Sequence, residues 1–259
     1  MKAKKSYGQH FLNSELIAQK IADSLEPAGT YTQVLEVGPG RGMLTKYLLG
    51  KDLQFIAVEA DSDMVFYLLK HFPELKGRVV EADFLKVPLD QLMKNQPFGL
   101  IGNFPYNISS QILFKMLEFK PLIPELVGMF QKEVAERIVA GPGSKIYGVI
   151  SVLIQAEYSG EYLFTVDRMN FSPPPKVQSA VIRMRRRPES LVKSDHSLFR
   201  QIVKQSFGQR RKMLRNTMKG FLKDDPILQS DFFRQRPEQL SVQEFVWLTA
   251  EVRSRLDKK

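Results

Sequence analysis

The sequence predicts an α/β fold with a smaller helical region at its C-terminal end. Short apolar runs that fit buried parallel strands alternate with helical patterns through the first part of the chain. Several of these runs end in glycine, carboxylate or amide residues, and ligands of open α/β sheets bind beyond the carboxyl ends of the strands. After Pro188 the pattern is helical. We therefore expect a ligand site at the strand ends and a helical module after it.

The length and composition indicate a soluble protein without a metal site. A chain of 259 residues, 43% of them hydrophobic, can form one main domain and a smaller one. No apolar run approaches the roughly 20 residues that span a bilayer. The start, Met1-Lys2-Ala3-Lys4-Lys5, leads into polar residues, so we expect a cytoplasmic protein. The absence of cysteine excludes disulfides and thiol chemistry, and the three histidines lack metal-ligand spacing: His10, His71 and His196.

The charge favours a polyanionic partner. The net charge is +10 and the pI about 9.6, although solubility alone could explain a basic protein. From Pro188 to Lys259 there are 15 Lys and Arg against 9 Asp and Glu, a net charge of +6. The excess is therefore concentrated in the helical region.

The N-terminal part contains a short arm and then a helix. The helical face is formed by Leu16, Ile17, Lys20, Ile21 and Leu25, with Asn13 or Ser14 as a cap and an end at Pro27 and Gly29. The arm, residues 9–12, is by itself best interpreted as an ordered tail that Phe11 and Leu12 hold by packing.

A glycine turn follows the first predicted strand, Gln33 to Val37. The turn, Gly38-Pro39-Gly40-Arg41-Gly42, leads into a helix that carries Leu44, Tyr47, Leu48 and Leu49. Glycines let the backbone approach a ligand at a helix N-terminus, which favours an anionic group. A dinucleotide fingerprint needs a third glycine where this chain has Met43 or Thr45, so a pyrophosphate is not the expected ligand.

The next two predicted strands each end at a carboxylate residue. The strand Gln54 to Val58 ends at Glu59, 21 residues beyond Gly38, where it can accept hydrogen bonds from both ribose hydroxyls. The alternative is a helix-start charge before Asp61 and Asp63. The strand Arg78 to Ala82 stops at Asp83 and Phe84, which offer an acceptor for an adenine amine and an apolar wall. A nucleoside pocket without a pyrophosphate motif indicates S-adenosylmethionine, with its carboxylate end at the glycine turn.

The fourth strand, Phe98 to Ile101, ends in the motif Asn103-Phe104-Pro105-Tyr106. The side chain of Asn103 and the backbone carbonyl of Phe104 are acceptors, and Tyr106 is a flat ring, so the motif suits a planar base with an exocyclic amine, such as adenine. The alternative is a strand end before a helix start, residues 107–110, in which Asn and Ser only cap.

The rest of the chain supplies further strands, helices and a second aromatic residue. We expect helices at residues 112–117 and near 131–135, strands at 126–130 and 179–184, a loop at 141–145, an apolar segment at 149–156 and an alternating one at 162–166. Phe171 precedes three prolines, which stiffen the loop. It could sandwich a base against Tyr106, although packing is the commoner role.

The C-terminal region is predicted to be helical, with Phe199, Ile202, Val203 and Phe207 on one face and a last helix from Val242 to Leu256. Four cationic residues fall close together on one predicted helix, where they could track phosphates: Arg210, Arg211, Lys212 and Arg215. A solvated helix face is the alternative.

Seven motifs over nearly the whole chain carry a specific resemblance. They are residues 8–12 (GQHFL), 36–40 (EVGPG), 103–108 (NFPYNI), 131–134 (QKEV), 143–148 (GSKIYG), 171–179 (FSPPPKVQS) and 210–212 (RRK). With them the chain resembles the ribosomal RNA adenine N6,N6-dimethyltransferases. The resemblance implies a Rossmann-like methyltransferase domain, residues 1–187, and a helical RNA-binding domain, residues 188–259. It also implies dimethylation of two adjacent adenosines near the 3′ end of 16S rRNA in the small ribosomal subunit, late in assembly.

The resemblance also implies roles for single residues. His10 and Leu12 match positions that contact the methyl donor, as do Gly38, Gly40, Glu59, Asp83, Phe84 and Asn103, and the catalytic motif would be residues 103–106. Tyr106 and Phe171 match the base-stacking aromatics. The family more often has leucine where this chain has Phe104, but the backbone carbonyl is kept. A monomer is expected.

Three other functions were weighed. A nicotinamide oxidoreductase lacks the third glycine, and no His or Lys suggests hydride chemistry. A large-subunit rRNA adenine N6-methyltransferase of the antibiotic-resistance type stays as the alternative, although residues 143–148 and the proline-rich segment resemble the small-subunit branch. An RNA-binding assembly factor without catalysis should have lost Glu59, Asp83 or Asn103, and all three are present.

Overall fold

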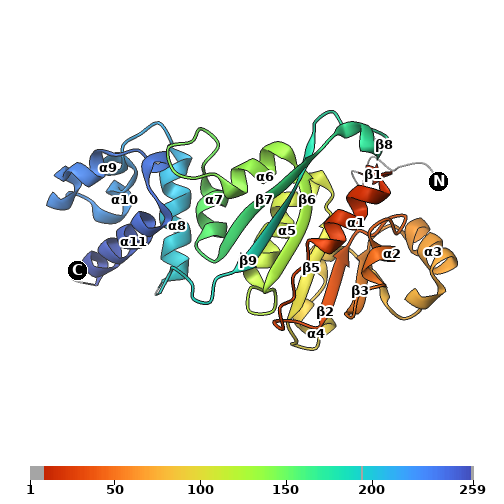
Figure 1. Ribbon diagram of the computed structural model, residues 1–259. Coiled ribbons are helices and arrows are strands. Elements are labelled where there is room, and N and C mark those ends of the chain that lie inside the picture. The colour runs from red at the N-terminus through yellow and green to blue at the C-terminus, as the bar shows by residue number, and fades with distance from the viewer. Residues whose placement is uncertain (1–8, 194, 258–259) are drawn as a thin grey trace. The chain divides into compact units, whose positions relative to one another are not determined.

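The computed structural model describes residues 9–193 and 195–257 (Figure 1). Met1 to Lys5 and Gly8, used in the predictions above, lie outside the described residues. The chain divides into two compact units, the first formed by Met1–Ala135 and Gly160–Arg186 and the second by Glu136–Ser159 and Arg187–Lys259. A separate domain that begins at residue 188 stays a prediction. In the structure, residues 136–159 belong to the second unit together with the C-terminal residues.

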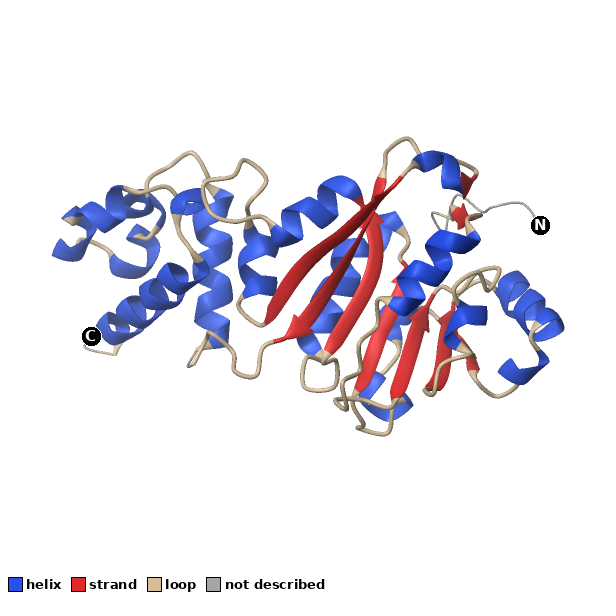
Figure 2. Ribbon diagram, viewed as in Figure 1, coloured by secondary structure: helices blue, strands red, loops and turns tan. Residues whose placement is uncertain are grey.

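A mostly parallel sheet forms the first unit (Figure 2). In the described residues it has seven strands in the order β4-β3-β2-β5-β6-β9-β7. Strands β4 to β6 pair in parallel and β9 is antiparallel to β6. Every residue of β2 is buried, as expected for a strand between two covered faces. The strands are β2 (Gln33–Val37), β3 (Gln54–Glu59), β4 (Val79–Glu81), β5 (Phe98–Asn103), β6 (Glu125–Gln131), β7 (Tyr158–Val166) and β9 (Ser179–Arg186).

The strand order creates a crevice at the carboxyl ends of β2 and β5. From β2 the chain proceeds outward to β3 and β4, then returns to β5 on the other side of β2. Loops on the two sides of such a switch point diverge, and ligands of open α/β sheets bind between them. The observed order therefore favours the strand ends that the sequence predicted for a ligand.

The helices of the first unit mostly follow the prediction. They are α1 (Glu15–Asp23), α2 (Thr45–Leu48), α3 (Ser62–His71), α4 (Leu89–Leu92), α5 (Ser109–Glu118) and α6 (Lys132–Val139), the last of which runs into the second unit. Ser14 caps α1 by accepting a bond from Ile17 N. The helix expected after the glycine turn is short: α2 begins at Thr45 and has four residues, with Leu44 and Leu49 as its caps. Gly40 and Gly42, with φ values of +55° and +77°, belong to the turn before it, as predicted.

Two short strands tie the N-terminal arm to the proline-rich segment. Strand β1 (Phe11–Leu12) pairs antiparallel with β8 (Phe171–Ser172), with Leu12 opposite Phe171. Phe11 and Leu12 are both buried, so the arm is packed as predicted. Residues about 160 positions apart in the chain are thereby held side by side.

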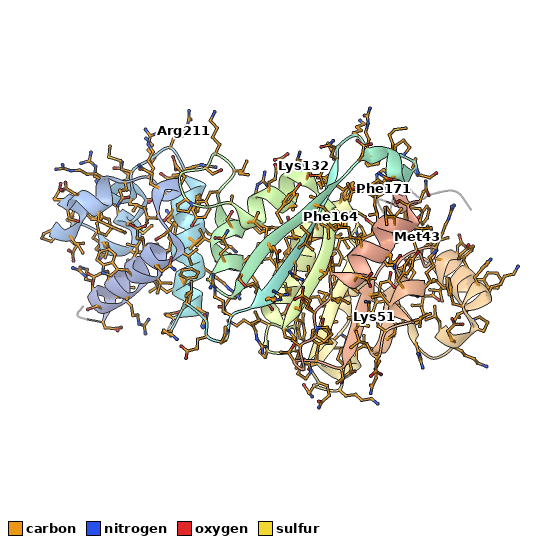
Figure 3. All side chains as sticks on the ribbon, in the orientation of Figure 1. Met43, Lys51, Lys132, Phe164, Phe171 and Arg211 are labelled. Carbon is orange, nitrogen blue, oxygen red and sulfur yellow. The ribbon has the colours of Figure 1, made fainter. Side chains whose placement is uncertain are left out.

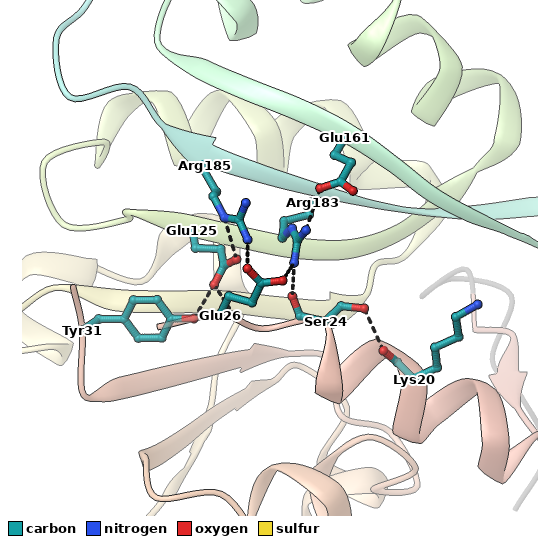
Figure 4. Close-up of polar contacts among 8 residues, drawn as sticks. All are labelled: Lys20, Ser24, Glu26, Tyr31, Glu125, Glu161, Arg183 and Arg185. Carbon is teal, nitrogen blue, oxygen red and sulfur yellow. Dashed lines mark hydrogen bonds and ion pairs between the residues drawn. The ribbon is translucent and has the colours of Figure 1, made fainter. Parts of the chain in front are cut away.

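The opposite end of the sheet is closed by a charged network (Figure 4). Glu125, the first residue of β6, accepts a bond from Tyr31 Oη at 2.5 Å and another from Glu26 N at 2.9 Å. Arg183 and Arg185 of β9 pair with Glu26. Burial beside Glu125 raises the pKa of Tyr31, which keeps the phenol protonated as a donor. The network joins the α1–β2 connection to β6 and β9, away from the crevice.

The second unit is helical apart from the first two residues of β7. Its helices are α7 (Val149–Gln155), α8 (His196–Gly208), α9 (Leu214–Thr217), α10 (Lys219–Leu222) and α11 (Val242–Leu256). Phe199, Ile202 and Val203 are buried, as predicted, while Phe207 is only partly buried. Helix α11 has the predicted bounds and begins with a capping box between Ser241 and Glu244. Within the described ranges, no helix is long and apolar enough to cross a membrane.

The single basic helix expected around Arg210 was wrong. Helix α8 ends at Gly208, and Arg210, Arg211 and Lys212 lie in the turn before α9, which contains Arg215. The turn reverses the chain so that Leu214 can be buried and its N–H can donate to Gln235 O. The apolar periodicity of α8 does not predict that the helix ends at Gly208, because the polar residues that follow are compatible with both a helix and a turn.

Candidate active site

A cavity of about 400 Å³ lies at the carboxyl ends of the central strands. This volume is in the range of small-molecule sites, about 300 to 1,000 Å³. Its lining unites residues from the arm, the glycine turn, the ends of β3 and β4 and the motif after β5. The predicted site residues that line it are His10, Leu12, Gly38, Gly40, Glu59, Asp83, Phe84, Asn103, Phe104, Pro105 and Tyr106. Phe171 is not among them, and Arg210, Arg211, Lys212 and Arg215 belong to the second unit.

Glu59 is a buried carboxylate held by backbone donors. Gly40 N donates to its Oε2 at 3.0 Å, and Asp61 N donates to its Oε1 at 2.9 Å. Its side chain is at the cavity wall and only 6% of the residue is exposed. Burial raises the pKa of Glu59, and the backbone hydrogen bonds oppose that rise. Each oxygen retains acceptor capacity for a ligand, so the carboxylate can receive a pair of hydroxyls.

Glu36 of β2 is a second buried carboxyl group, which does not line the cavity. Thr45 Oγ1 donates to its Oε2 at 2.7 Å. Burial, with a smaller contribution from the charge of Glu59, raises the pKa of Glu36 to about 8. The carboxyl group is therefore protonated in the folded protein at neutral pH.

The Glu36→Gln variant is expected to lose part of the pH dependence of stability. An unfolded glutamate releases its proton near pH 4.3, whereas folded Glu36 keeps it to about pH 8. Between these values the folded state binds more protons, so its stability falls as pH rises, by about 1.4 kcal/mol per pH unit. Urea unfolding at pH 5.5 and 7.5 should show a smaller loss in Glu36→Gln than in the wild type. Equal losses in both proteins would contradict the buried, protonated carboxyl group.

Asp83 and Phe84 form the wall of the cavity beyond β4. Asp83 caps a short 3-10 helix (Phe84–Lys86) by accepting a bond from Leu85 N at 3.0 Å, and its side chain stays about half exposed. Phe84 is buried. Lys115, a buried lysine of α5, donates to Leu85 O at 2.9 Å and to Val87 O at 2.6 Å, and so holds this segment from behind.

Asn103 and Tyr106 lie next to the N-terminal arm. Asn103 Nδ2 donates to His10 O at 3.0 Å, which leaves its Oδ1 as the free acceptor of the amide. The rings of His10 and Tyr106 stack with centroids 5.5 Å apart. Tyr106 Oη and Ser179 Oγ are hydrogen bonded at 2.5 Å, and burial raises the pKa of the tyrosine. The motif is thus fixed both by the arm and by β9.

Phe171 is not among the residues that line the cavity, and the base sandwich expected between it and Tyr106 stays a prediction. Phe171 is 3% exposed and belongs to a hydrophobic core cluster with Leu12 and Ile21. The backbone of Phe171 is held opposite Leu12 by the pairing of β1 with β8. The ring that stacks on Tyr106 in this structure is His10.

Three further residues support the cavity and were missed from the sequence. Gln9 Nε2 donates to Asp61 Oδ2 at 3.0 Å, which ties the arm to the start of α3. No pattern relates these two residues, because they are 52 positions apart. Lys115 could have been recognised from the sequence: it lies among the apolar residues of α5, on the part of the helix that is expected to be buried.

Within residues 9–193 and 195–257, no cluster of three or more His, Asp or Glu side chains could hold a metal ion.

Comparisons with known proteins agree on one family. The family model described as ribosomal RNA adenine dimethylase matches residues 1–232. A ribosomal RNA small subunit methyltransferase A from Bacteroides thetaiotaomicron is 54% identical over 259 residues, which cover 99% of this chain and 96% of that protein. One from Flavobacterium johnsoniae is 52% identical and covers 97% of this chain and 96% of its own length.

Two solved structures are similar over almost the whole chain. A dimethyladenosine transferase from Plasmodium falciparum has a TM-score of 0.79 and 26% identity, with coverage of 95% of this chain and 98% of that one. The 23S rRNA methyltransferase ErmE has a TM-score of 0.65 and 28% identity, with coverage of 95% and 99%.

Proposed function

Because the chain belongs to the ribosomal RNA adenine dimethylase family, we propose that it dimethylates N6 of two adjacent adenosines near the 3′ end of 16S rRNA. Relatives that are about half identical over their full length carry the name of a small-subunit rRNA methyltransferase, which supports this substrate. The observation that carries the proposal is the convergence of Glu59, Asp83 and Asn103 on one cavity. The enzyme would act as a cytoplasmic monomer, late in assembly of the small subunit.

The cavity fits S-adenosylmethionine as the methyl donor. When bound, it supplies an electrophilic methyl group on a sulfonium. Glu59 would accept hydrogen bonds from the ribose hydroxyls, because its carboxylate is already fixed by Gly40 N and Asp61 N. Asp83 would accept from the adenine amine, with Phe84 as the apolar wall. The glycine turn leaves room for the methionine end, and Arg41, which also lines the cavity, adds a positive charge there.

The acceptor side of the cavity suits an adenine amine. The N6 lone pair of adenine is delocalised into the ring, so the site has to make this nitrogen more amine-like. Asn103 Oδ1 and the Phe104 carbonyl would accept the two N6 hydrogens and direct the lone pair toward the methyl group. The bond from Asn103 Nδ2 to His10 O supports this orientation of the amide. Acceptors preorganised for developing positive charge are most effective in a dry site, and no general base is needed.

Tyr106 would hold the flipped base by stacking. Its bond to Ser179 fixes the ring, and His10 covers one face at 5.5 Å. A base on that face would take the place of the imidazole, so the arm would have to move when RNA binds. After the first transfer one N–H remains, and the pocket must accept the added methyl group for the second.

RNA binding by the second unit is proposed to depend on Arg211, Lys212 and Arg215. Arg211 and Lys212 are exposed in the turn after α8 (Figure 3). Arg210 has a different environment: it donates to Ser144 O at 3.0 Å and lies 3.9 Å from Glu238. Arg210 therefore joins two loops of the unit, and we propose a structural role for it.

The double variant Arg211→Ala/Lys212→Ala is expected to bind the small subunit more weakly and with a shallower salt dependence. Each lost phosphate contact should reduce the slope of log affinity against log salt by about 1. Affinity for the donor should not change. Arg234→Ala, an exposed arginine paired with Asp231 in the same unit, serves as the control and should keep the wild-type slope. A wild-type slope in the double variant would mean that the turn is only a solvated surface.

A transfer assay tests the proposed substrate. Unmethylated small subunits, large subunits and protein-free RNA are each incubated with radiolabelled S-adenosylmethionine, and the RNA is digested to nucleosides. We expect labelled N6,N6-dimethyladenosine from the small subunit. Label confined to the large subunit or its RNA would contradict the proposed substrate. The large-subunit alternative is not favoured, because the relatives at 54% and 52% identity carry the small-subunit name, whereas ErmE is 28% identical.

A further inference from the structure

Two glycines lie side by side on β5 and β6, one residue before Asn103, which lines the cavity. Gly102 of β5 and Gly128 of β6 are direct partners in the parallel register. Neither has a φ in the left-handed region, so the backbone at both positions would accept any L-residue. The need for glycine must therefore come from space above the strands.

The ring of Phe104 occupies that space. A Cβ added to Gly128 would lie 2.1 Å and 2.7 Å from two ring carbons of Phe104 and 2.9 Å from the Phe130 ring. One added to Gly102 would lie 2.8 Å from Val37 O and 2.9 Å and 3.0 Å from two other ring carbons of Phe104. Phe130 packs on the same ring with centroids 5.0 Å apart. Phe104 is only 1% exposed. The Phe104 ring thus packs against the backbone of the two glycines on one side and against the Phe130 ring on another.

The same residue carries one of the proposed acceptors. Phe104 N donates to Met129 O at 3.2 Å, so Phe104 is bound to β6 by its backbone as well as by its ring. The side chain of Asn103, the other acceptor, is one residue earlier. Since the chain leaves the sheet at this point, the depth at which the ring sits determines where both acceptors lie.

We infer that Gly128, together with Gly102, is a positioning residue for methyl transfer. The paired glycines receive the Phe104 ring and so set the positions of the Phe104 carbonyl and the Asn103 amide. This inference rests on the proposed function. Groups on rigid elements hold reacting atoms most accurately, and a displacement of about 1 Å can cost about 100-fold in rate.

The Gly128→Ala variant is expected to lower kcat for methyl transfer to small subunits by about 10- to 100-fold. Its KM for the subunit and its calorimetric Kd for S-adenosylmethionine should stay within about twofold of the wild type, because the substitution leaves the proposed ribose and adenine acceptors, Glu59 and Asp83, unchanged. A general structural defect would reduce affinity as well, so the separation of kcat from both binding constants identifies positioning.

Replacement of the ring should rescue the variant. Phe104→Leu keeps the backbone carbonyl and removes the Phe104 Cε2 atom, which the new Cβ would meet at 2.1 Å, while the contact with the Phe130 ring at 2.9 Å remains. The double variant Gly128→Ala/Phe104→Leu should therefore be faster than Gly128→Ala alone and within about threefold of Phe104→Leu. Such strong non-additivity is expected only for groups in contact.

Gly99→Ala is the matched control. Gly99 is on the same strand, and a Cβ there would lie 2.7 Å from the ring of Tyr31, at the end of the sheet away from the cavity. A clash of similar size should lower the melting temperature without changing the transfer rate per folded molecule.

The outcomes separate this inference from the proposed function. A wild-type protein that does not methylate adenosine N6 in small subunits contradicts the proposed function. An active wild type with a folded, fast Gly128→Ala variant overturns the inference alone. If Gly128→Ala does not fold, restored folding and rate in the double variant support the inference, whereas a double variant that stays unfolded or slow overturns it.

Discussion

Replacement of Asn103 with alanine is expected to slow methyl transfer by about 100- to 1,000-fold, the usual effect of removing one preorganised group that stabilises developing charge. Binding of the small subunit should be close to the wild type, because Tyr106 is unchanged. Single-turnover rates with saturating donor measure the effect directly.

A second substitution separates the two functions of the Asn103 amide. Asn103→Asp keeps an acceptor for the N6 hydrogen and loses the bond that Nδ2 donates to His10 O. It should therefore retain more activity than Asn103→Ala. If folded Asn103→Ala transfers methyl groups at nearly the wild-type rate, the proposed role of this residue is wrong.

Glu59→Gln is expected to weaken S-adenosylmethionine binding by about 1 to 3 kcal/mol, or about 5- to 150-fold, the scale for a buried polar group left without its partner. The amide keeps the shape of the side chain and loses half of its acceptor capacity. Calorimetric titration measures the change. Glu81→Gln is the matched control, because Glu81 is paired with Glu59 in the β3–β4 register but is exposed and outside the cavity.

Donor binding should also depend on pH through Glu59. Burial raises the pKa of this carboxyl group, and the ribose hydroxyls need its ionised form as acceptor. Affinity of the wild type should therefore fall as the pH is lowered toward the raised pKa, at a pH above that of an ordinary glutamate. Glu59→Gln should lack this dependence. If Glu59→Gln binds S-adenosylmethionine with the wild-type affinity at every pH, Glu59 is not part of the donor site.

The strands and the donor half of the cavity could be predicted because local rules determine them. Residues 33–37 and 98–101 are buried on both faces, so they are predominantly apolar and recognisable without a partner strand. Parallel strands end at the same edge of the sheet, and this rule was sufficient to bring Gly38, Glu59, Asp83 and Asn103 together. The structure agrees with it in detail.

Features that depend on pairing between distant segments could not be predicted. The position of Phe171 follows from the β1–β8 pairing, which no periodicity in either segment indicates. The opposed glycines 102 and 128 become significant only when the register of β5 and β6 is known. A turn stands at Arg210 where a helix was predicted. It is held by hydrogen bonds between residues distant in the chain, from Leu214 N to Gln235 O and from Arg210 to Ser144 O, which local sequence patterns do not indicate.

The most direct test of the account is a time course of methyl transfer to unmethylated small subunits, with monomethyladenosine and dimethyladenosine quantified separately at the two target nucleotides. The account predicts that the wild type converts both adenosines to N6,N6-dimethyladenosine and that Asn103→Ala slows both transfers while binding persists. Methylation at another atom or on another RNA, or equal rates in the two proteins, would contradict it.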